Sequence, residues 1–248
     1  MGRFISAELF HFVGRDHPND HEANYETLKK ILTMGCVSHH PHERGWGAMS
    51  VTVDWSKRLI NGDLVVPSVT CYCDIPFEHL GLHLRKYGHF GLSFERKLLV
   101  RCGARPVIYV PLRADDHLSI FGSVLLRDIE AVYRGFRTQI HTPLNVSSGR
   151  SRSLGVEPAS PIDAAAALDS VLTKDFLAFV KPYDSELPDN HMNYFYSERE
   201  WRKYGNLVFQ MSDLGKVVVG ANYIDRLAND MPKLRGIIHT APLASTDN

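Results

Sequence analysis

The chain has 248 residues, 44% of them hydrophobic and 23% charged, and its 28 basic and 28 acidic side chains cancel when histidine is neutral. This is ordinary globular composition, and the balanced charge argues against a broad phosphate-binding surface. No apolar run approaches the roughly 20 residues that span a bilayer, and no signal peptide is evident. Because four cysteines are too few for a disulfide framework in a chain of this length, we expect a cytoplasmic protein without a membrane segment.

Short strands and helices are predicted from the start of the chain. Residues 7–13 have the two-residue apolar period of a strand, with His11 on it. A helix follows, with Asn24 as the expected N-cap and Gly35 as its stop. Three histidines within residues 39–42 invite a metal hypothesis, but their spacing around a proline is not that of a zinc site. We therefore predict no metal and interpret this segment as an active-site loop or a solvated turn.

The next segments predict three further strands. Residues 66–74 alternate as a strand, and Pro76 is suited to the first turn of a helix that follows. Residues 88–94 read as a short strand before a helix over 95–102. A continuous apolar run at 106–111, bounded by prolines, predicts a buried strand.

The period changes in the middle of the chain. Apolar residues step by three and four over 116–140, which predicts a long amphipathic helix, and a second helix is expected over 161–180. Two helices alone cannot enclose a core, so we interpret residues 116–180 as a helical-hairpin insertion. Its arginines, among them Arg134 and Arg137, would form either a docking surface or a solvated face.

The most distinctive stretch is acidic and aromatic, and it reads Tyr194-Phe-Tyr-Ser-Glu-Arg-Glu-Trp-Arg-Lys203. On a strand, Glu198 and Glu200 would point to one face and Arg199 to the other. Burial beside the rings would raise the pKa of a carboxyl, and nearby arginine would lower it. Such a pair is typical of a catalytic site, although a surface ion-pair cluster gives the same pattern.

The remaining elements complete an irregular order. Strands are expected at 207–210 and 216–219, a helix at 222–234 and an edge strand at 236–239. Strands scattered among helices without regular alternation favour the α+β class. We predict a single domain over residues 1–248 that contains the helical insertion.

Three blocks of the sequence stand out together. They are Leu9-Phe-His-Phe with Leu-Lys-Lys-Ile-Leu-x-x-Gly (28–35); Cys73-Asp-Ile-Pro with His83, Tyr87-Gly-x-Phe-Gly-Leu-Ser and Gly-Ala-Arg-Pro-Val-x-Tyr-Val (103–110); and Ser-Glu-Arg-Glu-Trp-Arg (197–202). In this order the blocks resemble the AbiGi-type proteins of bacterial abortive infection, which are antitoxins of phage-defence systems. The resemblance spans most of the chain outside the helical insertion, its most specific part is the Glu-Arg-Glu-Trp-Arg run, and it implies a partner protein of a toxin–antitoxin system.

A second resemblance is to ADP-ribosyltransferases, including the DarT-like toxins that modify DNA. It rests on His11 in the first strand, the helix that ends at Gly35, a Ser or Tyr strand and the late Glu-x-Glu. It implies a core of short, mainly antiparallel strands and NAD as the substrate. The sequence departs from that pattern in lacking an arginine beside His11 and a Ser-Thr-Ser run.

The same resemblance implies a role for each site residue. Glu200 would bond the ribose 2′-hydroxyl and stabilise the oxocarbenium-like centre, while Glu198 would position or deprotonate the acceptor. His11 would hold the nicotinamide ribose, and Tyr87 would offer a ring for stacking. The remaining residues expected to bind NAD are Phe12, Ser93 and Arg199.

Three candidate functions follow, and the first two belong to different classes. The first is a phage-defence enzyme that transfers ADP-ribose from NAD to nucleic acid or protein. The alternative is a catalytically inactive antitoxin or sensor that binds a partner protein. A metal-dependent nuclease or deaminase that uses residues 39–42 is a third, with the weakest spacing.

Overall fold

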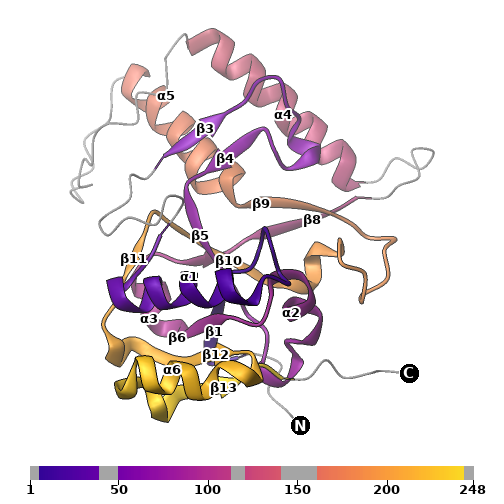
Figure 1. Ribbon diagram of the computed structural model, residues 1–248. Helices are drawn as coiled ribbons and strands as arrows, with labels where there is room; N and C mark the ends of the chain where they lie inside the picture. Colours follow the sequence, from indigo (N-terminus) through magenta and orange to yellow (C-terminus); the bar gives the residue numbers. More distant parts are fainter. Residues whose placement is uncertain (1–5, 39–49, 113–120, 141–160, 243–248) are drawn as a thin grey trace. The chain divides into compact units, whose positions relative to one another are not determined.

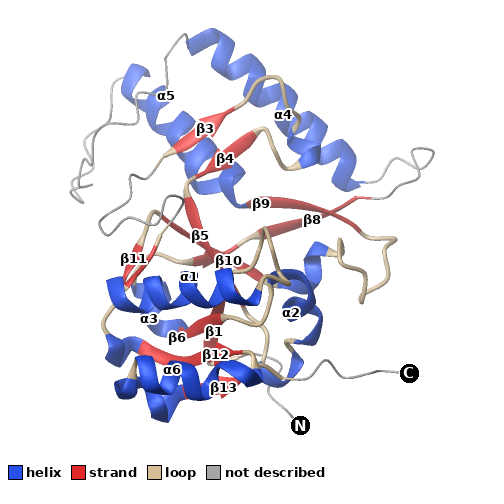
Figure 2. Cartoon of the chain, in the orientation of Figure 1, coloured by secondary structure: helices blue, strands red, loops and turns tan. Residues whose placement is uncertain are grey.

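The computed structural model describes residues 6–38, 50–112, 121–140 and 161–242. The chain divides into two compact units, and Figure 2 shows that each contains both helices and strands. The α+β class is therefore confirmed. The ADP-ribosyltransferase-like core and the single domain stay predictions. The first unit comprises Met1–Ala48, Val69–Val107 and Leu187–Asn248, and the second comprises Met49–Ser68 and Ile108–Glu186.

The first unit is built on a seven-stranded sheet, in the order β13-β12-β6-β1-β5-β10-β7 (Figure 1). Its strand pairs are antiparallel except for the parallel pair of β12 and β13. The predicted last edge strand is thus confirmed as β13. The strands are β1 (Glu8–Phe12), β5 (Val69–Cys73), β6 (Gly91–Glu95), β7 (Arg105–Pro106), β10 (Glu200–Tyr204), β12 (Leu214–Val219) and β13 (Ile238–Thr240). A separate small pair joins β2 (Cys36–Val37) to β11 (Leu207–Val208).

Helices cover both faces of this sheet. On one face, α1 (His21–Met34) and α6 (Ile224–Asp230) pack with Leu9, Tyr72 and Leu92 in one buried cluster. On the other face, α2 (Gly81–Tyr87) contributes Leu84 to a cluster with Phe10. Neighbouring strand residues such as Leu9 and Phe10 belong to different clusters because side chains alternate across a strand. Each fully buried large apolar side chain stabilises the fold by about 1.5–3 kcal/mol.

Helix α1 ends where the sequence predicts. Gly35 has a φ of 61°, and its N–H donates to the Ile31 and Leu32 carbonyls. A Cβ at this position would lie 2.8 Å from the Phe209 carbonyl oxygen, so only glycine fits without strain. The predicted N-cap, in contrast, is wrong: Asp20 accepts a hydrogen bond from the Ala23 N–H, and the helix begins three residues before Asn24.

Two of the predicted strands are each two strands in the structure. The run at 66–74 divides at Ser68 into β4 (Val65–Pro67) in the second unit and β5 in the first. The run at 106–111 divides at Val107 into β7 and β8 (Ile108–Leu112), and Ile108 is 43% exposed, so the prediction of a single buried strand is wrong. In both places the apolar pattern continues while the strand changes its pairing partner.

The second unit joins two strand pairs to the predicted helices. β3 (Val51–Val53) pairs with β4, and β8 pairs in parallel with β9 (Val180–Asp184). The helices are α4 (Phe121–Ile140) and α5 (Pro161–Ser170), which continues as a π-helix over Val171–Phe176. The described helices include none with the length and apolar character needed to cross a bilayer.

Ion pairs and hydrogen bonds hold α4 in place. Arg137 Nη1 lies 2.6 Å from Asp169 Oδ2 on α5, and Arg134 Nε lies 2.9 Å from Glu130 Oε1. Only 14% of the Arg137 side chain and 33% of the Arg134 side chain is exposed. Arg137 is therefore largely buried against α5, whereas Arg134 stays partly exposed, and a role of these arginines in docking stays a prediction.

Candidate functional site

The register of the sheet distributes the predicted site residues over two faces. Ser93 on β6 lies opposite Phe10 on β1, Phe10 lies opposite Cys73 on β5, and Cys73 lies opposite Glu200 on β10. Directly opposite residues share a face, so these four form one row across the sheet. His11 follows Phe10 along the strand and therefore lies on the opposite face from Glu200.

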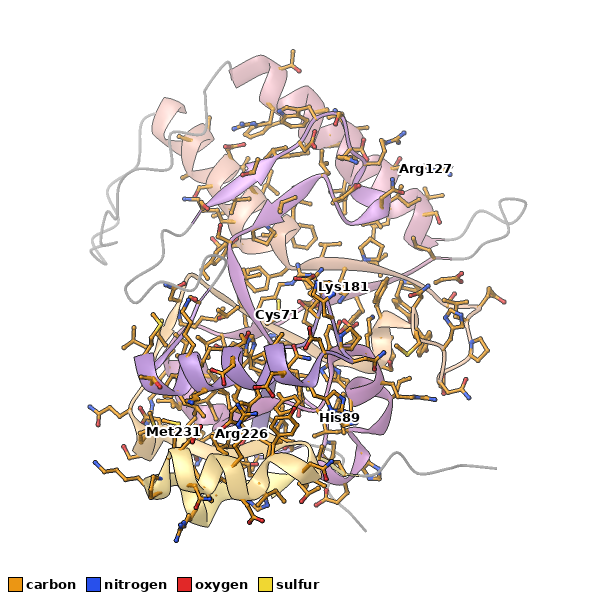
Figure 3. All side chains as sticks on the ribbon, in the orientation of Figure 1. Cys71, His89, Arg127, Lys181, Arg226 and Met231 are labelled. Carbon is orange, nitrogen blue, oxygen red and sulfur yellow. The ribbon has the colours of Figure 1, made fainter. Side chains whose placement is uncertain are left out.

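His11 contacts the neighbouring strand. Its Nδ1 lies 2.8 Å from the Cys71 carbonyl oxygen, and because a carbonyl only accepts, the imidazole donates this hydrogen bond. The ring centroid lies 5.8 Å from that of Tyr72, whose side chain belongs to the cluster beneath α1. This imidazole thus links β1 to β5 on the α1 face. Figure 3 labels Cys71.

Glu198 is the centre of a buried polar cluster on the α2 face. The side chain is 5% exposed, and its Oε1 accepts from Lys86 Nζ at 2.5 Å and from the Tyr87 hydroxyl at 2.7 Å. Lys86 also lies over the Phe195 ring, 4.3 Å from its centroid, in a cation–π contact. Three hydrogen-bonding groups from α2 and the 3₁₀ turn at Phe195–Glu198 are thereby held together.

Electrostatics connects both acidic residues to Tyr87. Burial raises the pKa of the Tyr87 hydroxyl well above its ordinary value, and the charges of Glu198 and then Glu200 raise it further. Tyr87 therefore stays protonated and donates to Glu198. The thiol of Cys73 likewise has a raised pKa, caused first by burial and then by Glu198. Both carboxylates thus lie within electrostatic reach of one phenol.

Glu200 forms an ion pair with Arg202. Glu200 is 7% exposed, and its Oε1 lies 2.8 Å from the Nε of Arg202, two residues along β10. Residues two apart on a strand share a face, which is why this pair forms within one strand. Lys86 and Arg202 are ion-pair partners of the two acidic residues that were not among the predicted site residues. The two-residue rule applied to β10 would have found Arg202.

A change of backbone direction separates the two acidic residues. Arg199 has φ 45° and ψ 50°, in the left-handed region that residues other than glycine rarely adopt. Glu198 ends a 3₁₀ turn and Glu200 begins β10, so the expectation that both lie on one strand is wrong. The Arg199 guanidinium lies 3.7 Å from Asp74 Oδ2, and Arg96 Nη2 lies 3.0 Å from Asp74 Oδ1.

The remaining predicted residues occupy packed positions. Ser93 is fully buried, and its Oγ accepts from the Lys216 N–H at 2.8 Å, where the register of β12 with β6 shifts. Phe12 is 8% exposed, and its ring lies 5.2 Å from that of His83. The His83 ring in turn lies 4.5 Å from that of Tyr87. Phe12 and Tyr87 are therefore brought together through His83. The histidines of residues 39–42 lie outside the described residues.

Two hollows of the first unit lie away from the acidic pair. One has a volume of about 300 Å³ and adjoins Glu8 and Asp213, and the other has a volume of about 250 Å³ and adjoins His21 and His89. Glu198 and Glu200 line neither of them. In this arrangement the two carboxylates can fix α2 and the 3₁₀ turn against the sheet.

The family comparison agrees with the first resemblance. A family model described as "Putative abortive phage resistance protein AbiGi, antitoxin" matches residues 49–233. This range contains the second and third sequence blocks, while the first block, which ends at Gly35, precedes it. No curated protein and no solved structure matches the chain.

Proposed function

The chain belongs to the AbiGi family of abortive phage resistance proteins, and on that premise we propose that it acts as an antitoxin by binding a partner toxin protein. The observation that carries this proposal is the match of the family model over residues 49–233. The acidic pair agrees with it, because Glu198 binds Lys86 and Glu200 binds Arg202, and both carboxylates are buried. A cation thus compensates each of these two buried charges, as a structural role requires.

An apolar strip on α4 supports binding of a protein partner. Leu125 is 49% exposed and Val132 is 69% exposed, and they lie seven residues apart on the same side of the helix. Val124 adds a third side chain that is 40% exposed. Exposed apolar side chains that gather on one face are a common feature of protein-binding surfaces. We assign the toxin-binding surface to this strip.

The experiment is a growth assay in a bacterial host. The chain is expressed together with the protein encoded beside its own gene, and growth and co-purification are measured. We expect the wild type to relieve the toxicity and to co-purify with its partner. The double variant Leu125→Glu/Val132→Glu should lose both properties, because charges in the centre of an apolar interface are strongly disfavoured.

The matched control is Val100→Glu on α3 (Arg96–Arg101) of the first unit. Val100 is 50% exposed, close to the value for Leu125, so the substitution adds one surface charge at a residue that does not belong to the strip. It should leave growth rescue unchanged. Equal rescue by the double variant would overturn the assignment of the strip. Absence of both rescue and co-purification for the wild type would overturn the antitoxin proposal.

ADP-ribosyl transfer from NAD to nucleic acid or protein is the second candidate function. It is favoured by the burial of two carboxylates within electrostatic reach of Tyr87. His11 lies on the opposite face of the sheet, so a transferase site on the α2 face would use Glu198, Glu200 and Tyr87 without that imidazole. Release of nicotinamide from labelled NAD by the wild type, and its loss in Glu200→Gln, would favour this second function.

A further inference from the structure

The smaller hollow of the first unit lies at the carboxyl ends of two parallel strands. β12 ends at Val219 and β13 ends at Thr240, and these residues are paired in register. The segments that follow, 220–223 and 240–242, line the hollow together with His21 and His89. Its volume of about 250 Å³ is sufficient for one small ring system. Figure 3 labels His89 in this region.

His89 lines the hollow and has a hydrogen-bonding atom without a partner among the described residues. Its Nδ1 is shielded from solvent and has no hydrogen-bond partner within the described part of the chain. Burial, together with nearby His21, lowers the pKa of His89, so the imidazole is neutral at neutral pH. Leaving such an atom unpaired is unfavourable, and in native proteins it commonly marks a place that a ligand or water completes.

Aromatic rings form the walls. The His21 ring lies 5.6 Å from the His89 ring and 6.5 Å from the Tyr223 ring, and the Tyr223 ring lies 5.0 Å from that of Phe90. Asn222 and Thr240 add an amide and a hydroxyl to the lining. Among the described residues that line the hollow there is no lysine or arginine, so the site suits an uncharged ring better than a phosphate group.

We propose that this hollow binds a planar nitrogen heterocycle of the nucleobase class. The ring packs against His21 and Tyr223, and, once the imidazole turns toward the hollow, a ring N–H or exocyclic amine donates to His89 Nδ1. A nucleobase combines a flat apolar face with a polar edge, which is the combination that this lining offers. Neither the toxin-binding proposal nor the acidic pair enters into this assignment.

The test is calorimetric titration of the full chain with adenosine, guanosine, cytidine and uridine separately, and with benzene as a flat ring that has no hydrogen-bond donor. We expect at least one nucleoside to bind more tightly than about 1 mM and at least tenfold more tightly than benzene. The variant His89→Phe keeps the ring and removes Nδ1. This variant should bind that nucleoside at least tenfold more weakly, while the melting temperature of the protein stays the same or rises.

Two further variants keep the test decisive. His191→Phe, on an exposed residue outside the lining, should leave the affinity unchanged. Ala221→Trp, at an exposed position of the lining, should fill the hollow and abolish binding even if His89→Phe proves unstable. Absence of nucleoside binding at millimolar concentration, tighter binding of benzene, or unchanged affinity in both His89→Phe and Ala221→Trp would each overturn the proposal.

Discussion

Replacing Lys86 with methionine should leave the Glu198 carboxylate buried without its cation. Removing one partner of a buried ion pair costs about 3–5 kcal/mol. The Lys86 side chain is 21% exposed, and the Tyr87 hydroxyl would still donate to Glu198. Because solvent and this second donor offset part of the loss, we expect about 2–3 kcal/mol of destabilisation. For a chain of this size that lowers the melting temperature by roughly 5–10 °C.

The assay is urea unfolding, followed by tryptophan fluorescence and by far-ultraviolet circular dichroism, with the slope of the transition compared between variants. The double variant Lys86→Met/Glu198→Gln removes the stranded charge and keeps an acceptor for Tyr87. It should recover to within about 1 kcal/mol of the wild type, since replacing both partners of a buried pair is often neutral.

The control for these Lys86 variants is Lys57→Met. Lys57 lies 3.8 Å from Asp63 in an exposed pair, so its loss should cost less than about 1 kcal/mol. The buried-charge explanation is refuted if Lys86→Met lowers the free energy of unfolding no more than Lys57→Met does. It is also refuted if the double variant is as unstable as the sum of the two single ones, because the stranded charge would then not be the cause.

Three further predictions concern strain, protonation and thiol reactivity. Arg199→Gly should stabilise the fold by about 0.5–1 kcal/mol, because glycine adopts φ 45° without the side-chain clash. Arg199→Val should lower the melting temperature. A valine variant that melts above the glycine variant would contradict backbone strain at this residue. His89 has a folded-state pKa below its ordinary value, so the stability of the protein should fall as pH drops below about 6.5. Urea midpoints measured at several pH values should depend less steeply on pH for His89→Phe than for the wild type. An equal dependence on pH in both proteins would contradict this. Iodoacetamide should modify exposed Cys102 in the native protein and spare Cys73, whose pKa burial raises; mass spectrometry that finds rapid labelling of Cys73 would contradict this burial.

Local signals in the sequence predict where a helix ends better than they predict which strands pair. Gly35 stops α1 as expected because a left-handed C-cap depends on one residue and its backbone. The N-cap is wrong because Asp20 and Asn24 are both good capping residues, and the choice between them depends on where the preceding loop leads the chain.

Strand partners depend on residues far away in the sequence. The apolar run through Ser68 continues while the chain passes from β4 to β5, which belong to different compact units. No local period records such a change. The left-handed backbone at Arg199 is similarly invisible, because arginine is not a residue that signals a positive φ.

In the candidate site, too, the local sequence predicts burial but does not predict which side chains meet. That Glu198 and Glu200 are buried was predictable from the aromatic residues around them, and the structure places both below 10% exposure. The face on which His11 lies was not predictable, because a shift of one residue in the pairing of β1 moves every side chain to the other face. Lys86 reaches Glu198 through a contact between residues 112 positions apart.

Growth rescue by Glu200→Gln against the partner toxin, with nicotinamide release from labelled NAD measured on the same preparations, distinguishes a binding antitoxin from an enzyme. If the protein acts by binding, the folded variant rescues growth as well as the wild type does, and neither preparation releases nicotinamide. Loss of rescue in a variant that still folds and co-purifies with the toxin, together with nicotinamide release by the wild type, would contradict the account and make Glu200 a catalytic residue.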